Sequence, residues 1–140
     1  MTGLGGIIYS IPSYKLRMRT EKVKARIKLN GVEVDAVFDT GAPVSVVPKE
    51  LAMRLGGYTE LRKKYYAGTA KKGVGVRIIG RVADVLPEVG GCSEIPSTSF
   101  EVSDEVDHVI IGRPELDKWD IIFTPEGPKP RKCPVELEII

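Results

Sequence analysis

Asp39 is the residue of this sequence best placed to do chemistry. It lies in the segment F-D-T-G-A-P-V-S-V, residues 38–46, directly after one apolar stretch and just before another at residues 44–47. A carboxylate between two buried segments is costly to hold unless other interactions compensate for its lost hydration. Asp39 therefore either occupies an ordinary surface turn or carries a charge that the protein uses.

Peptide hydrolysis is one reaction that carboxylates of this kind perform. It takes two carboxylates close together that share one proton, because like charges at that separation cannot both ionise. The ionised group removes a proton from water while the protonated group polarises the scissile carbonyl, so no Ser or Cys nucleophile is needed. Asp39 begins the only D-[TS]-G segment of the sequence, that is, an Asp followed by Thr or Ser and then Gly. One chain cannot supply the pair, but a twofold-symmetric dimer would place Asp39 against its own copy.

Other kinds of site find little support. His108 is the only histidine, which excludes His-based triads and sites with several histidine ligands. It could join Cys92 and Cys133 around zinc, but their spacing matches no common zinc-ligand pattern, so we expect a structural histidine. The glycine-rich residues 68–75 have Val74 where a phosphate-binding loop requires Lys, and they meet neither nucleotide-binding motif. We expect no metal and no cofactor.

The composition is that of one globular domain. The 140 residues are 42% hydrophobic and 29% charged, and a net charge of +2 is too small to argue for nucleic acid. No apolar run approaches the ~20 residues that span a bilayer, and the N-terminus does not resemble a signal peptide. We therefore expect a cytoplasmic protein with two free thiols. The absence of Gln and the single Asn are typical of heat-adapted proteins, in which a Cys92–Cys133 disulfide is also conceivable.

A β-hairpin is expected to position Asp39. Residues 22–29 alternate between basic and apolar side chains, and residues 32–38 continue the alternation up to Asp39, which is typical of half-buried strands. Between them, Asn30-Gly31 supplies the positive-φ pair that a type I′ turn requires.

The rest of the chain predicts more strands and two short helices. The expected elements are a helix at about 48–55 between Pro48 and Gly56, a hairpin from residue 65 with a basic tip and a return strand at 77–89, a strand at 97–102, a strand buried on both faces at 109–112, a helix at 114–119 and a core strand at 120–124. The Pro-rich residues 124–134 suit no packed element, whereas residues 134–140 alternate like a strand.

The motif D-T-G-A-x-x-S, followed some seventy residues later by I-I-G-R at 110–113, resembles the retropepsin-like aspartic proteases. The resemblance runs from about Lys22 to Thr124 and includes a glycine-containing hairpin between the two motifs. It implies an all-β, retropepsin-like closed β-barrel with two short helices, one lobe per chain. It also implies that residues 1–140 form a single domain whose termini contribute to a dimer interface.

The resemblance assigns a role to each residue of the active-site loop. Asp39 is the catalytic residue, and Thr40 would form a hydrogen bond across the dimer axis. Gly41 would let the backbone approach the substrate, and Ala42 would line the cleft. Two residues would support the loop, Ser45 from beside the carboxylate and Gly112 from beneath it.

A flap formed by residues 67–76 would close over the peptide and exclude water. Tyr66, Ala67, Gly68 and Thr69 resemble the Tyr-Gly-Thr of pepsin flaps, and three further residues would either contact apolar substrate side chains or belong to the core: Val76, Ile78 and Ile111. The sequence departs from the retroviral pattern at Pro43, where an Asp normally pairs with the Arg of I-I-G-R. Arg113 must therefore pair elsewhere, with Glu115 or Asp117 as candidates, or the dimer contacts are rebuilt.

The leading hypothesis is a homodimeric aspartic endopeptidase that cuts extended peptides between apolar residues at acidic to neutral pH. Its partners would be a second copy of the chain and a peptide or unfolded protein, with no nucleic acid and no membrane. The alternative is a retropepsin-like dimerisation or peptide-binding module with little or no hydrolysis, which would hold a segment by strand addition. A third interpretation is a structural β-barrel with Asp39 in an ordinary surface turn.

Overall fold

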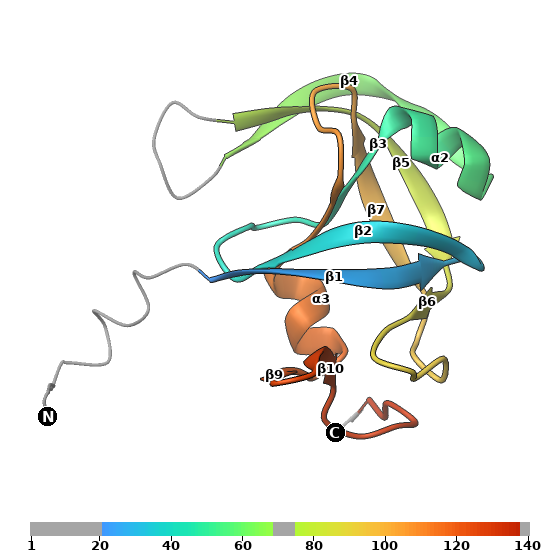
Figure 1. Cartoon of the computed structure of the whole chain (residues 1–140). Helices are drawn as coiled ribbons and strands as arrows, with labels where there is room; N and C mark the ends of the chain where they lie inside the picture. Colours follow the sequence, from blue (N-terminus) through green and yellow to red (C-terminus); the bar gives the residue numbers. More distant parts are fainter. Residues whose placement is uncertain (1–20, 69–74, 138–140) are drawn as a thin grey trace, which may run out of the picture.

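The computed structural model of the chain describes residues 21–68 and 75–137 (Figure 1). The elements in this part of the chain are, in order, β1 (Lys22–Leu29), β2 (Val32–Asp39), β3 (Val46–Pro48), α2 (Lys49–Leu55), β4 (Tyr58–Gly68), β5 (Gly75–Val85), β6 (Pro87–Glu88), β7 (Thr98–Ser103), β8 (Val109–Ile111), α3 (Arg113–Lys118), β9 (Ile121–Thr124) and β10 (Gly127–Pro130). Neither helix is long and apolar enough to cross a membrane.

The β1–β2 hairpin has the predicted form. Asn30 and Gly31 have φ values of 51° and 80°, which are the positive values that a type I′ turn needs. The strands pair in register from Leu29 opposite Val32 to Lys22 opposite Asp39. Because side chains alternate between the two faces of a strand, this register places the apolar residues of both strands, apart from Val37, on the core side and ends the hairpin at Asp39.

Eight strands form one sheet in the order β4-β5-β7-β3-β8-β2-β1-β6. Within it, β2 pairs with β8 in parallel and β3 pairs with β7 in parallel, so segments far apart in the sequence lie side by side (Figure 1). The edge strands β4 and β6 do not pair with each other among the described residues. The closed barrel that we expected is therefore wrong. Because β6 is only two residues long, it offers few main-chain groups with which to close the sheet.

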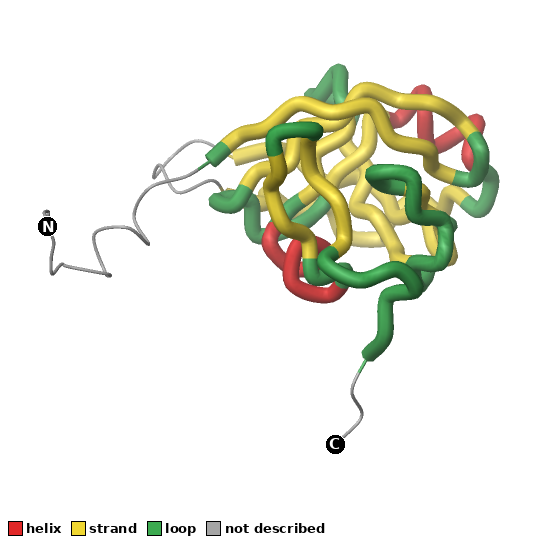
Figure 2. The backbone as a smooth tube through the Cα atoms, turned by 60° about the horizontal axis from the view of Figure 1, so that its bottom comes forward, coloured by secondary structure: helices red, strands yellow, loops and turns green. Residues whose placement is uncertain are grey.

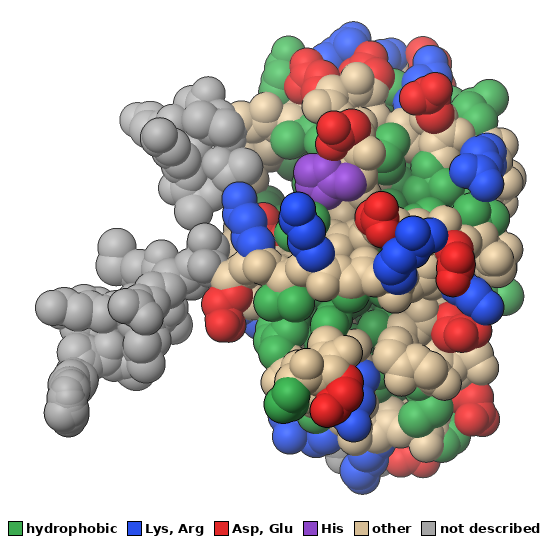
Figure 3. All heavy atoms as spheres, viewed as in Figure 1, with side chains coloured by type: hydrophobic (Ala, Val, Ile, Leu, Met, Phe, Trp, Pro, Cys, Tyr) green, Lys and Arg blue, Asp and Glu red, His purple; other side chains and the backbone are tan. Residues whose placement is uncertain are grey.

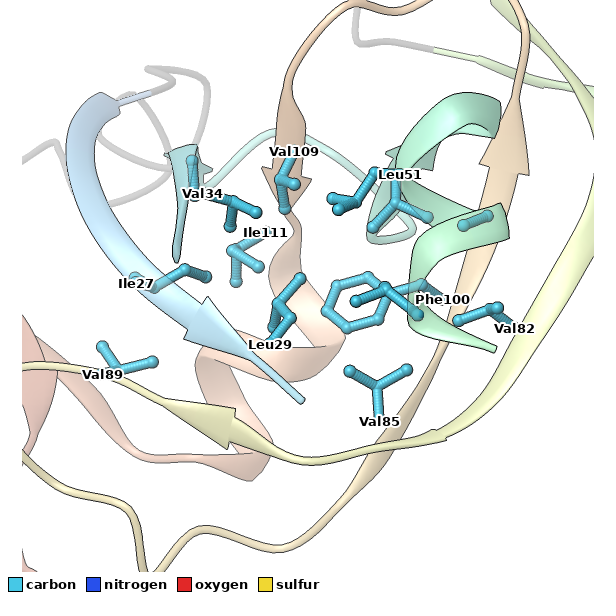
Figure 4. Close-up of a cluster of buried hydrophobic side chains, with 14 of the residues drawn as sticks. Ile27, Leu29, Val34, Leu51, Val82, Val85, Val89, Phe100, Val109 and Ile111 are labelled. Atoms are coloured by element: carbon cyan, nitrogen blue, oxygen red, sulfur yellow. The ribbon is translucent and has the colours of Figure 1, made fainter. Parts of the chain in front are cut away.

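The core lies on the inner side of this sheet and beneath α2 (Figure 4). Phe38 and Phe100 are fully buried there, as is Trp119 at the end of α3. Buried side chains of α2 also belong to this cluster. Both helices lie within one residue of their expected bounds at each end. The last residue of β2, which carries the candidate carboxylate, thus follows directly on the core residue Phe38.

The C-terminal part differs from the expectations. Among the described strands, β9 pairs only with β10, in a separate two-stranded sheet, and it has no fully buried residue, so it is not the core strand that we expected. The Pro-rich segment forms β10, in which Pro128 and Pro130 are buried. Proline is tolerated in an edge strand because the N–H it lacks is not needed on the unpaired side. Residues 134–137 form no strand (Figure 2), and the remainder of that expected strand lies outside the described residues.

Cys92 and Cys133 form a disulfide. The bond joins the segment before β7 to the segment after β10, and the main chain beside it is held by a hydrogen bond from Val135 N to Glu94 O of 2.9 Å. The expectation of free thiols is therefore wrong, and the alternative that the sequence left open is the one found. With both thiols bonded to each other, neither is available as a zinc ligand.

Candidate active site

Asp39 is held at the end of a strand that has neighbours on both sides. Its cross-strand partner on β1 is Lys22, and the preceding residue, Phe38, pairs with Ile111 of β8. The Asp39 side chain is partly exposed, and its Oδ1 accepts a hydrogen bond of 2.9 Å from Gly41 N. Bonds from backbone N–H groups to a carboxylate are among the stronger hydrogen bonds in proteins. The carboxylate therefore has a defined orientation while remaining accessible to solvent.

The active-site loop consists of residues 40–45. Its first residue, Thr40, forms two hydrogen bonds with Glu21, the residue that precedes β1. Thr40 N donates to Glu21 O at 3.0 Å, and Glu21 N donates to Thr40 Oγ1 at 2.8 Å. A threonine hydroxyl has one donor proton as well as its acceptor sites. Within the described residues Oγ1 only accepts and its proton has no acceptor; the bond across a dimer axis that we expected of Thr40 stays a prediction.

Gly112 packs directly beneath the active-site loop. A Cβ added there would lie 2.5 Å from Val44 O and 2.8 Å from Ala42 O, so no larger residue fits without moving this backbone. Gly112 N donates to Ser45 Oγ at 2.8 Å, and the next residue, Arg113, donates its N–H to Ala42 O at 2.8 Å. The I-I-G-R turn thus holds the loop through both packing and hydrogen bonds.

Pro43 stands where the retroviral pattern has the Asp that pairs with the Arg of I-I-G-R, and Arg113 has other partners in this structure. Its guanidinium lies 3.4 Å from Asp117 Oδ1 on the same helix, and it also donates to Thr40 O at 3.3 Å. Of the two candidate partners, Asp117 is the one found. Both side chains of this pair are more than half exposed, so we expect the ion pair itself to contribute little to stability.

Glu115 is instead buried, with 7% of its surface exposed. Its carboxylate accepts hydrogen bonds from the hydroxyls of Ser45 and Thr98, the latter at 2.6 Å. Sequence reasoning considered Glu115 only as a partner for Arg113. No sequence signal marks it, because a glutamate in the first turn of a short helix after Pro is ordinarily exposed.

Val37 and Ile110 form a partly exposed apolar pair near Asp39. They are cross-strand partners on β2 and β8 and lie on the face opposite the core. Because residues two apart on a strand share a face, Val37 and Asp39 point the same way. Ile111, which we considered as a substrate contact, is fully buried in the core. A shift of one residue along a strand reverses the face, so the partly exposed side chain is that of Ile110 and not that of Ile111.

His108 lies at the surface and not in the core (Figure 3). Its side chain is 43% exposed, and Nδ1 lies 2.7 Å from Asp107 Oδ1. The hydrogen bond from His108, and then its charge, lower the pKa of the Asp107 carboxyl below its usual value. Among the described residues, no group of three or more His, Cys, Asp and Glu side chains could hold a metal ion.

The hairpin expected to form the flap consists of β4 and β5, which pair as far as Gly68 opposite Gly75. Tyr66 is 68% exposed and Ile78 is fully buried, while Ala67 and Val76 are partly buried and Gly68 is exposed. Thr69 and the rest of the expected tip lie outside the described residues. Ile78 is thus a core residue, whereas the other described positions keep some exposed surface.

The base of this hairpin is joined to β7 by a cluster of polar side chains. Glu101 forms an ion pair with Arg81, with Nε to Oε1 at 2.8 Å, and accepts a hydrogen bond from the Tyr65 hydroxyl. Burial, followed by the hydrogen bond and the negative charge of Glu101, raises the pKa of Tyr65 to about 12. Nearer the tip of the hairpin, at the start of β5, Arg77 N donates to Glu105 Oε1 at 2.9 Å.

Comparisons with known proteins agree with this geometry. The model of the family described as "gag-polyprotein putative aspartyl protease" matches residues 25–118. None of the curated proteins is a significant match to the chain in sequence. Among solved structures, the chain is similar to the retroviral protease-like domain of Ddi1 from Leishmania major, with a TM-score of 0.56 and 26% identity over 75% of this chain and 82% of that one.

The EIAV protease complexed with the inhibitor HBY-793 is a further match, with a TM-score of 0.49 and 23% identity over 79% of this chain and 92% of that one. The family model spans both motifs of the site, from β1 through the D-T-G-A loop to the end of α3. The chain belongs to the gag-polyprotein putative aspartyl protease family, and so to the retropepsin-like aspartic proteases.

Proposed function

We propose that the protein is a homodimeric aspartic endopeptidase. In this proposal, Asp39 and its symmetry mate together activate the water that attacks the peptide bond. The observation that carries the proposal is the setting of Asp39: a partly exposed carboxylate at the end of a central strand, oriented by Gly41 N–H. Membership of an aspartyl protease family supports the same conclusion.

The arrangement of the loop suits this chemistry. Gly41 N–H engages Oδ1 of Asp39, whereas Oδ2 has no hydrogen-bond partner among the described residues. In a symmetric dimer this second oxygen would face the partner's carboxylate, and the two groups would share one proton. One Asp39 would then act as the base towards water while the protonated one polarises the carbonyl.

Apolar side chains on either side of the scissile bond are the proposed preference. Val37 and Ile110 present partly exposed apolar surface on the face that carries Asp39. Burial of a substrate methylene against such surface contributes roughly 0.8 kcal/mol. The β4–β5 hairpin would close over the bound peptide and exclude water from the carboxylates.

The test is cleavage of an apolar peptide library between about pH 3 and 8, the range over which a coupled carboxylate pair can titrate. The wild type is compared with Asp39→Asn and with the matched control Asp35→Asn, which changes an exposed aspartate four residues earlier on the same strand. We expect cleavage with a bell-shaped pH profile by the wild type and the control, and none by Asp39→Asn. A folded wild type that binds these peptides but never cuts them would instead establish the peptide-binding module.

A further inference from the structure

Glu115 is a buried carboxylate whose place in the fold needs an explanation. It is 7% exposed, and among the described residues no Lys, Arg or His forms an ion pair with it. An isolated buried charge is strongly unfavourable unless hydrogen bonds satisfy its oxygens. Here Oε1 accepts the Ser45 hydroxyl and Oε2 accepts the Thr98 hydroxyl, so each oxygen has one donor.

The Ser45 hydroxyl connects this carboxylate to the turn beneath the active site. A serine hydroxyl has a single proton, and Ser45 donates it to Glu115. The same Oγ accepts the N–H of Gly112 at 2.8 Å. Because the Gly112 N–H can only donate to Ser45 Oγ, the hydroxyl proton of Ser45 is directed to Glu115, and the bonds run in one direction from Gly112 N–H through Ser45 to Glu115.

The chain of hydrogen bonds acts on the active-site loop from Ala42 to its last residue, Ser45. Ser45 is the last loop residue, and its carbonyl also accepts Glu101 N at 3.0 Å. Gly112 is in contact with the Ala42 and Val44 carbonyls, and Arg113 N donates to Ala42 O. A shift of Ser45 Oγ would therefore move the turn against which the residues following Asp39 are packed.

We propose that Glu115 is a positioning residue for the active-site loop, acting through Ser45 and Gly112 to hold Asp39 in its working orientation. This inference rests on the proposed protease function and deepens it. Thr98 binds the same carboxylate from β7 and, in the described part of the chain, forms no hydrogen bond with residues 40–45. It therefore offers a matched control that alters the environment of Glu115 but leaves the bond from Ser45 in place.

The test compares Glu115→Leu, Ser45→Ala, Thr98→Val and Glu115→Gln, each measured well below its own unfolding temperature. We expect Glu115→Leu and Ser45→Ala each to lower kcat by about 10- to 100-fold, because displacements of about 1 Å can cost that much, with KM nearly unchanged. Glu115→Gln keeps an oxygen that can accept the Ser45 hydroxyl and should restore most of kcat. Thr98→Val should lower the unfolding temperature but keep kcat.

A double variant tests whether Glu115 affects kcat through Ser45. If Glu115 acts through Ser45, the Ser45→Ala/Glu115→Leu enzyme should be no slower than Ser45→Ala alone, since residues of one network are not additive. Full additivity would overturn the proposal, as would an unchanged kcat in Glu115→Leu or an equal loss in Thr98→Val.

Amide hydrogen exchange tests the inference separately from activity. We expect Glu115→Leu, but not Thr98→Val, to speed exchange at the N–H groups of Gly41 and Gly112. If the wild type cuts no peptide but this difference is found, the proposed function fails while the positioning of the loop stands. If exchange at both glycines is the same in all folded variants, the positioning role is contradicted whether or not the wild type is active.

Discussion

Gly112→Ala is the substitution whose effect the structure specifies most fully. The backbone of Gly112 is extended, with φ of −96°, so alanine is not strained by its own conformation. Its Cβ would lie 2.5 Å from Val44 O, about 0.9 Å closer than an ordinary contact. The obstacles are backbone atoms of the active-site loop, which cannot rotate away. The loop and the I-I-G-R turn must therefore separate.

The cost follows from that separation. Overpacking of this kind typically costs 1–3 kcal/mol, and weakening the bonds from Gly112 N to Ser45 and from Arg113 N to Ala42 adds about 0.5–1 kcal/mol each. We expect the free energy of unfolding to fall by about 3 kcal/mol, which lowers Tm by roughly 12 °C in a domain of this size. A displacement of about 1 Å at the loop should also reduce kcat/KM by about 100-fold.

Urea titration and thermal unfolding measure the loss of stability, and peptide cleavage measures the loss of activity. Gly68→Ala is the control for stability, because a Cβ there meets no atom of the described residues within 4 Å; we expect it to change the free energy of unfolding by less than about 0.5 kcal/mol. Gly112→Ala with wild-type stability and wild-type cleavage would refute the close packing of the turn beneath the loop.

Three further predictions concern other parts of the fold. Asn30→Ala should destabilise the protein by about 2 kcal/mol, since its side chain forms two hydrogen bonds with backbone groups; an unfolding free energy equal to that of the wild type would contradict this. Reduction of the Cys92–Cys133 bond, which links positions 41 residues apart, should lower the unfolding free energy by about 2–4 kcal/mol, as measured by urea titration with and without a dithiol. Glu101→Gln should lower the pKa of Tyr65 from about 12 towards its ordinary 10, as read by ultraviolet titration. In the wild type the folded state favours the neutral phenol of Tyr65, so the raised pKa of Tyr65 stabilises the fold fully below pH 10, and this stabilisation is lost as pH rises from 10 to 12. An unchanged tyrosine titration in Glu101→Gln would exclude the role given to Glu101.

The hairpin that leads to Asp39 could be predicted from the sequence because its signals are local. A period of two in hydrophobicity and the Asn30-Gly31 turn both depend on residues next to one another in the chain. The two short helices were also found, from Pro48 and Gly56 at the ends of one and Pro114 at the start of the other. The place of Gly112 beneath the loop was expected only from the family resemblance, and the pairing of β2 with β8 that brings I-I-G-R there was not predicted.

The sequence-based predictions that were wrong or missing concern features set by contacts between distant parts of the chain. An apolar run such as residues 109–111 does not show which side chains face the core, so Ile111 could not be told from Ile110. The burial of Glu115 depends on hydroxyls from two other segments, and no local pattern reports it. The pairing of β10 with β9 and the unpaired edges of the sheet likewise depend on how distant elements meet.

Subunit mixing tests most directly whether one active site contains Asp39 from two chains. Wild type is incubated with a ninefold excess of Asp39→Asn until subunits exchange, and cleavage is compared with the same dilution into Asp35→Asn. Random pairing leaves about one dimer in a hundred with two intact Asp39 residues, so we predict that activity falls to about a hundredth of that of the same total amount of wild type. Activity that stays at about one tenth, in proportion to the wild-type chains, would show that a single chain carries a complete site and would contradict the account.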